Sequence, residues 1–202
     1  DPYPQFSKYQ FGRVDDSFAD VNVDVSVPDT DAQGVTTATG SIGDIAETTL
    51  PLKAAITISI HEPGGRTTDK SVEIPVRTHD VAIGILPDFD GGSVAENARA
   101  GFEAIAVDAT GKRIALSGLT YTWVKENTTY QWYQTGGEWK YQSVTRDRLV
   151  SSGSLAIDAA KAAKLAQQMP YGSYRLTITD PKSGAASSYR FYSGWSASAN
   201  GD

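Results

Sequence analysis

The fold-determining stretch runs from residue 119 to residue 142: LTYTWVK at 119–125, TYQWY at 129–133, the turn TGG at 135–137 and EWKYQ at 138–142. Large and polar residues alternate along it with a period of two, which is typical of β-strands because successive side chains point to opposite faces. Similar runs, separated by turn signals, recur at roughly the 8–12-residue spacing of an antiparallel sandwich. The sequence therefore predicts an all-β fold. The other runs after residue 80 lie at residues 104–107, 148–151, 173–179 and 188–192.

The first part of the chain carries the same alternation with smaller side chains. Four valines at residues 21–27 alternate with polar residues and predict a strand that buries one face. Residues 56–60 and 72–76 predict two further strands, joined by a turn at Glu62-Pro63-Gly64-Gly65. Pro75 lacks a backbone donor, so we expect its strand to lie at an edge or to end there.

One segment departs from the strand pattern. Residues 159–168, AAKAAKLAQQ, have the best helix propensity in the chain. A segment of this length is marginal as an isolated helix, and it lies between two strand-like runs. We therefore expect at most one or two helical turns there, on the surface of a sandwich.

Charge and aromatic content divide the chain near residue 80. Residues 1–79 carry 6 basic and 12 acidic residues, whereas residues 80–202 carry 12 of each and all four tryptophans. No aromatic residue occurs between Phe18 and Phe89. This break predicts two consecutive β-sandwiches, residues 1–79 and residues 80–202, joined at about Arg77–Asp80.

Composition excludes several classes of function. The chain has no cysteine, so it can make no disulfide, thiolate metal site or thiol-derived covalent bond. A net charge of −6 over 202 residues argues against nucleic acid or an anionic membrane surface as a partner. The longest apolar stretch, about Val81 to Pro87, is too short to span a bilayer. No targeting segment is visible at Asp1, so either the protein stays where it is made or this is a piece of a longer one.

Catalytic and metal-binding constellations are not found. His61 and His79 are the only histidines, and no Gly-x-Ser-x-Gly pattern accompanies them. Residues 29–34 and 88–92 imitate the opening of a calcium loop, but Gly40 and Arg99 stand where the bidentate glutamate is needed. We interpret both as turns in which aspartate caps backbone donors, and we expect no catalytic residue, metal or cofactor.

The most concentrated feature is aromatic. Within each predicted strand the rings lie two residues apart and share a face, so adjacent strands would bring six rings into a cross-strand ladder. This candidate packing or interaction face has two interpretations: a large-residue core or domain contact, and a stacking platform for sugars or a peptide. Its residues are Tyr121, Trp123, Tyr130, Trp132, Trp139 and Tyr141.

Two sets of residues resemble consecutive domains, the fifth and sixth macroglobulin domains, of the bacterial alpha-2-macroglobulins. The resemblance covers nearly the whole chain, and its most specific part is Tyr130–Tyr133 followed by Trp139–Tyr141. The first set consists of Tyr9–Phe18, Glu62–Arg66 and Ile74–Arg77. The second set also includes Ile105–Asp108, Gly118-Leu119, Trp123, Glu126, Tyr171–Leu176 and Phe191–Trp195.

The resemblance implies macroglobulin-type (Ig/fibronectin-like) sandwiches from a periplasmic, lipid-anchored protease trap. In that family a protease cuts a bait region and an exposed thioester captures it. This chain differs from the family pattern because it has no cysteine and therefore no thioester motif. No residue of the trapping reaction can be assigned to it. It would be a scaffold segment ahead of the bait region. Its partners would be neighbouring domains and, for the full-length protein, target proteases, with the membrane reached only through an anchor outside the segment.

Two alternatives of other classes stay open. One is an Ig-like carbohydrate- or ligand-binding module that uses the aromatic face. The other, an enzyme, is disfavoured because the constellations that chemistry needs are missing.

Overall fold

The computed structural model describes residues 3–61 and 64–194, apart from the side chains of residues 128–131 and 143–144, and it confirms the all-β prediction. The described part has one short 3-10 helix, η1 (Pro4–Phe6), and eleven strands. These are β1 (Gln10–Phe11), β2 (Leu52–His61), β3 (Thr67–Val76), β4 (Val81–Pro87), β5 (Ser93–Val94), β6 (Arg99–Asp108), β7 (Leu116–Thr135), β8 (Glu138–Ile157), β9 (Ala163–Gln168), β10 (Gly172–Thr179) and β11 (Ala186–Ser193).

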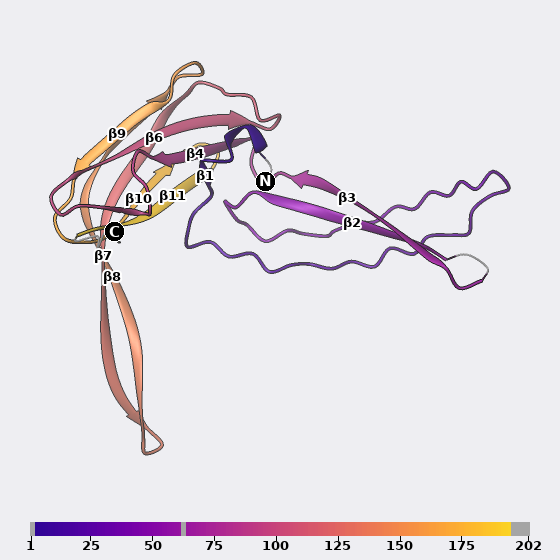
Figure 1. Ribbon diagram of the computed structural model, residues 1–202, viewed down its shortest axis with the longest axis horizontal. Coiled ribbons are helices and arrows are strands. Elements are labelled where there is room, and N and C mark those ends of the chain that lie inside the picture. The colour runs from indigo at the N-terminus through magenta and orange to yellow at the C-terminus, as the bar shows by residue number, and fades with distance from the viewer. Residues whose placement is uncertain (1–2, 62–63, 195–202) are drawn as a thin grey trace, which may run out of the picture.

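Two sheets pack face to face and form a sandwich (Figure 1). One has the order β1-β4-β6-β9 and the other the order β5-β11-β10-β7-β8, with antiparallel neighbours except for the short β5–β11 pair. Trp123, Phe102 and Phe191 meet edge-on or tilted between the sheets, with ring centroids 5.4–6.0 Å apart. These aromatic rings occupy the centre of the hydrophobic core, where they bury the most area per residue.

The N-terminal segment belongs to this sandwich in space. Strand β1 pairs with β4, and Phe11 packs with Ile105 and Val107 in a second apolar cluster that also includes Tyr3 and Phe6. Residues 77–80 lie between β3 and β4, outside the strands. The division at residues 79 and 80 into two separate sandwiches stays a prediction, and residues 3–11 pack with the second part.

Strands β2 and β3 form a two-stranded antiparallel sheet of their own, and Glu62 and Pro63 of the turn predicted between them lie outside the described residues. Because the described part of this sheet has only two strands, β3 is an edge strand, as Pro75 indicated; Pro75 pairs with Lys53 of β2. The apolar side chains on this hairpin, however, are not covered: Ile58 is 51% exposed and Val72 49% exposed. The alternation predicted the strands correctly, but within the described residues nothing packs over their apolar face.

The strand expected at residues 21–27 is wrong. No strand lies between β1 and β2, and the four valines are 42–57% exposed. The chain runs out and back beside the β2–β3 hairpin (Figure 1), reversing at Asp31, whose carboxylate accepts bonds from the Gln33 and Val35 N–H groups at 2.9 and 2.8 Å. Alternation is a necessary feature of a half-buried strand, but a ladder partner is also needed, and this segment has none.

The helical turns expected at residues 159–168 are also wrong. Asp158 caps a turn by accepting a 2.7 Å bond from the Ala160 N–H, and Ala163–Gln168 then forms β9 along β6. Side chains of β9 alternate between partly buried and exposed, and Leu165 packs on the core. Cross-strand hydrogen bonds and burial at an open sheet edge outweigh helix propensity, which is only a few tenths of a kcal/mol per residue.

Candidate functional site

The longest continuous feature is the hairpin formed by β7 and β8. The strands predicted separately at 119–125 and 129–133 are parts of one continuous strand, β7. Those predicted at 138–142 and 148–151 are parts of β8, and β7 and β8 have 20 residues each. Gly136 and Gly137, with φ of 58° and 82°, form the two-residue turn between Thr135 and Glu138. Both angles are positive, which glycine adopts without strain. The outer half of the hairpin projects beyond the sandwich (Figure 1).

The structure separates the six predicted aromatic residues, so they do not form one ladder. Trp123 is 2% exposed in the core, and Tyr121 is half-buried against it, over Gly153 of β8. Tyr130 pairs through its backbone with Ser143, and its side chain lies outside the described residues. The remaining three rings lie at the outer end of the hairpin.

Trp132, Trp139 and Tyr141 share one face of the hairpin, which we name the aromatic face. The register pairs Trp132 with Tyr141, whose ring centroids are 5.5 Å apart, and Gln134 with Trp139. All three rings are 63–67% exposed. This placement fits an interaction surface and not the large-residue core, because a core ring would be buried as Trp123 is.

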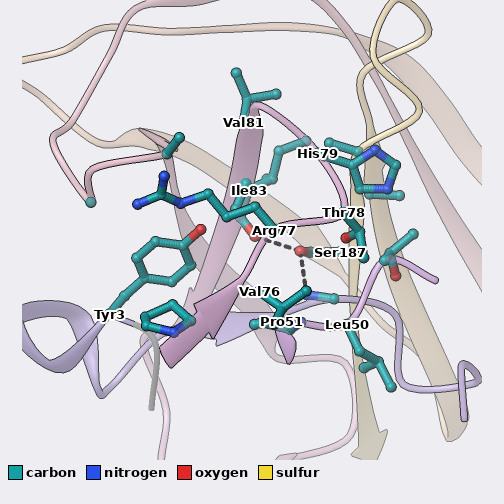
Figure 2. Close-up of a pocket in the computed structure, with 18 of the residues that line it drawn as sticks. Tyr3, Leu50, Pro51, Val76, Arg77, Thr78, His79, Val81, Ile83 and Ser187 are labelled. Atoms are coloured by element: carbon teal, nitrogen blue, oxygen red, sulfur yellow. Dashed lines mark hydrogen bonds between the residues drawn. The ribbon is translucent and has the colours of Figure 1, made fainter. Parts of the chain in front are cut away.

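A second candidate site is the junction where residues 12–16 lie against β11. Ser188 N–H donates to the Gly12 carbonyl at 3.1 Å, and the Ser188 hydroxyl accepts from the Val14 N–H at 2.8 Å. The hydroxyl of Ser187, fully buried, accepts from the Gly12 N–H at 2.8 Å and donates to the Ile83 carbonyl; Figure 2 shows both bonds as dashed lines. These two adjacent serines connect the first part of the chain to the second.

Five charged side chains beside these serines form what we call the arginine clasp: Asp15, Glu126, Asp147, Arg175 and Arg190. Asp15 pairs with both arginines, and Glu126, 9% exposed, also contacts both. The Nε of Arg190 donates to Glu126 at 2.7 Å and its Nη2 donates to Asp15, and these two bonds raise the pKa of Arg190. The Nε of Arg175 lies 2.9 Å from Glu126 but is not aimed at it, so that contact is an ion pair without a hydrogen bond. With three carboxylates and two guanidinium groups, the clasp fixes Asp15 to the outer face of β10 and β11.

A cavity of about 170 Å³ lies at the same junction. Figure 2 shows its lining from both parts of the chain, including Leu50, Pro51 and Val76 on one side and Val81 and Ile83 on the other. Such a volume admits a few waters but not a drug-sized ligand, which takes roughly 300–1,000 Å³. We interpret the cavity as imperfect packing between the two parts.

The two histidines lie in unlike places. His79 lines the cavity, and its Nε2 is buried without a hydrogen-bond partner among the described residues. His61 is exposed at the end of β2, where its Nδ1 lies 3.0 Å from the Thr67 hydroxyl.

No group of three metal-ligating residues occurs in the described part of the chain. Residues 3–61 and 64–194 also contain no helix long and apolar enough to cross a membrane.

Sequence reasoning missed the arginine clasp. Asp15 is 160 residues from Arg175 and 175 residues from Arg190 in the sequence. Asp15 and Arg175 lie in segments that carry the family resemblance, but nothing in those segments pairs them. The only local signal is that the β10–β11 register places Arg175 directly opposite Arg190. Two adjacent cations on an outer face require carboxylates nearby, but the sequence does not say which ones.

Comparison with known proteins gives matches across almost the whole chain. The family model described as the bacterial alpha-2-macroglobulin MG5 domain matches residues 1–78, and the model for bacterial macroglobulin domain 6 matches residues 84–195. A tandem of macroglobulin domains is therefore the class of protein that the fold and the matches define.

Relatives and solved structures agree with these models. The alpha-2-macroglobulin of Xylella fastidiosa strain 9a5c is 32% identical over 147 residues, which are 72% of this chain and 9% of that protein. The structure of native E. coli alpha-2-macroglobulin is 26% identical, with a TM-score of 0.74, over 100% of this chain and 14% of that one. The E. coli protein activated by porcine elastase has the same identity and TM-score over 97% of this chain and 18% of that one.

The chain belongs to the bacterial alpha-2-macroglobulin family and corresponds to its fifth and sixth macroglobulin domains. It spans about a tenth of the length of the curated relatives that it matches.

Proposed function

We propose that this chain is a non-catalytic scaffold segment of a protease-trapping alpha-2-macroglobulin. The full-length protein would be a broad-spectrum endopeptidase inhibitor of the periplasm, attached to the inner membrane by a lipid anchor outside residues 1–202. The observation that carries the proposal is the match of two consecutive domain models, in the family's order, over nearly the whole chain. The E. coli relative has been solved in a form activated by elastase, which supports a response to proteases in this protein as well.

The residues of the chain support a structural role within such a protein. The chain has no cysteine, so the thiol of a thioester must come from another part of the full-length polypeptide. The serines at 187 and 188 and the arginine clasp hold the first part of the chain against the second. Contacts of this kind fix the position of one domain relative to another and catalyse no reaction.

The test compares the full-length protein with residues 1–202 after incubation with trypsin or elastase. We expect the full-length protein to form a protease adduct that survives denaturation, because its thioester can acylate the enzyme. Residues 1–202 should leave protease activity unchanged and form no adduct. In cells with a permeabilised outer membrane, added protease should reach the full-length protein while a cytoplasmic marker stays intact.

Two outcomes would contradict the proposal. An adduct formed by residues 1–202 alone would show trapping chemistry in this segment. A full-length protein that neither forms an adduct nor slows cleavage of a large protein substrate would not be a protease trap.

A further inference from the structure

Among residues 3–61 and 64–194, no third strand pairs with the outer half of the β7–β8 hairpin. Strand β10 accompanies β7 only as far as the pair Ser173 and Glu126, and from Asn127 to Thr135 strand β7 pairs with β8 alone. At about 3.3 Å per residue, this two-stranded part extends roughly 30 Å beyond its last neighbour. An isolated two-stranded hairpin is marginally stable in water, so a hairpin of this length needs support from another surface.

The two faces of the projecting hairpin differ in chemistry. One is the aromatic face, on which Trp132, Trp139 and Tyr141 are 63–67% exposed. On the other face the register pairs Tyr133 with Lys140 and Thr135 with Glu138, which places both charges of the outer end there. Exposed tryptophan and tyrosine gathered on one uncharged face are typical of the centre of a protein interface.

The size of the aromatic face indicates what kind of partner it fits. Rings of this type bury about 150–250 Å² each when fully covered, so covering the exposed two-thirds of three rings removes roughly 300–500 Å² from water. If the partner buries an equal area, the total is roughly 600–1,000 Å², at or below the lower limit of about 1,000 Å² for a stable complex between separate proteins. A surface on the same polypeptide needs far less area, because covalent connection supplies a millimolar effective concentration.

We propose that the aromatic face docks in cis against an apolar surface of another domain of the same full-length polypeptide, outside residues 1–202. This rests on one part of the proposed function, namely that the chain is a segment of a longer alpha-2-macroglobulin. The chain spans only 9% of the Xylella fastidiosa relative, so most of the surface available to it lies outside these residues. The hairpin then acts as an arm that fixes the sandwich relative to a domain distant in sequence.

The experiment uses the full-length protein with a benzophenone photo-crosslinking residue at position 139, replacing Trp139. The matched control carries the same residue in place of Tyr133, which is 45% exposed on the opposite face of the same hairpin. We expect the probe at position 139 to crosslink to a peptide of the same polypeptide outside residues 1–202, and the crosslinked product to keep the mass of a monomer. The probe at position 133 should not form that crosslink. Adding Trp132→Ser should reduce the crosslink from position 139, whereas adding Lys140→Ser should leave it unchanged.

Several results would overturn the proposal. Crosslinks between two copies would indicate a dimer, and equal or absent crosslinks at both positions would indicate an unoccupied face. Binding to a sugar array that disappears with Trp132→Ala, with the thermal midpoint intact, would indicate a carbohydrate platform. Protease trapping by the wild-type protein is measured separately. Intact trapping without the crosslink refutes only the proposed docking of the aromatic face. The crosslink without trapping refutes only the proposed protease-trapping function.

Discussion

At the residue scale, Asp180 illustrates how one buried carboxylate fixes a turn that the junction depends on. It is 2% exposed at the end of β10 and accepts bonds from the Lys182 N–H at 3.1 Å and the Ser183 hydroxyl at 2.6 Å. Burial by itself would raise the pKa of Asp180, but these hydrogen bonds outweigh it and lower the pKa below its ordinary value. The turn leads directly into Ser187 and Ser188.

This lowered pKa predicts a loss of stability in acid. A carboxylate whose pKa is lower in the folded state stabilises the fold above its unfolded pKa of 3.8, and the contribution disappears as pH falls through the folded value. We expect Asp180→Asn to flatten the dependence of the unfolding midpoint on pH between about pH 5 and pH 2. Asp180→Ala should cost about 1–3 kcal/mol near neutral pH, because buried donors lose their acceptor. Denaturant titrations at a series of pH values test this, and an unchanged pH profile in Asp180→Asn would contradict it.

At the element scale, β7 passes from a protein core into solvent within one continuous strand. Trp123 is 2% exposed and contacts Phe102, whereas Trp132, nine positions further along, is 66% exposed. Nine is an odd separation, so the two rings point to opposite faces of β7: Trp123 faces the opposing sheet, and Trp132 lies on the face that carries Glu126. Strands β10 and β11 and the facing sheet cover the inner half, but only β8 accompanies the outer half.

The two halves of β7 should respond differently to truncation of a ring. Trp123→Ala should destabilise residues 1–202 by about 3–5 kcal/mol, because it removes a large side chain from a packed core. Trp132→Ala in the same chain should change stability by no more than about 0.5 kcal/mol, the usual range for an exposed position. Urea unfolding followed by far-ultraviolet circular dichroism measures both. Equal losses for the two variants would mean that Trp132 is covered within this chain.

At the scale of the whole molecule, the two parts of the chain are held by contacts between residues far apart in sequence. Asp15 reaches Arg175 and Arg190, and Ser187 links Gly12 to Ile83. Glu126 and Arg175 are mostly buried, at 9% and 17% side-chain exposure, so this network is less screened than a surface ion pair. The orientation of the first part therefore depends on the clasp.

Breaking the clasp should loosen the molecule without unfolding the sandwich. In Arg175→Met, Glu126 and Asp147 lose a cation and Asp15 keeps only Arg190, so we expect a larger radius of gyration by small-angle X-ray scattering. The effect should grow with salt, because the remaining pairs are screened. The matched control is Lys53→Met, which breaks the exposed pair of Lys53 with Glu73 on the β2–β3 hairpin and should leave the radius unchanged. Equal radii for both variants and the wild type would show that other contacts set the orientation.

What the sequence by itself determined is local. The period-2 runs predicted β2, β3, β6, β7, β8, β10 and β11, and glycines and aspartates predicted the turns at Gly136-Gly137 and Asp31. These features depend on the conformations that a few neighbouring residues allow, so they can be read from neighbouring residues alone. The motif of aromatic residues also predicted the family.

What only the tertiary structure decided is which of these surfaces are covered and by what. Residues 21–27 alternate as residues 56–60 of β2 do but have no ladder partner, and the alanine-rich residues of β9 became a strand because β6 offered a free edge. The aromatic residues divided between core and solvent, since burial depends on the surface opposite each ring and not on the ring itself. The clasp joins residues at separations up to 175, a distance over which no local pattern in the sequence specifies a partner.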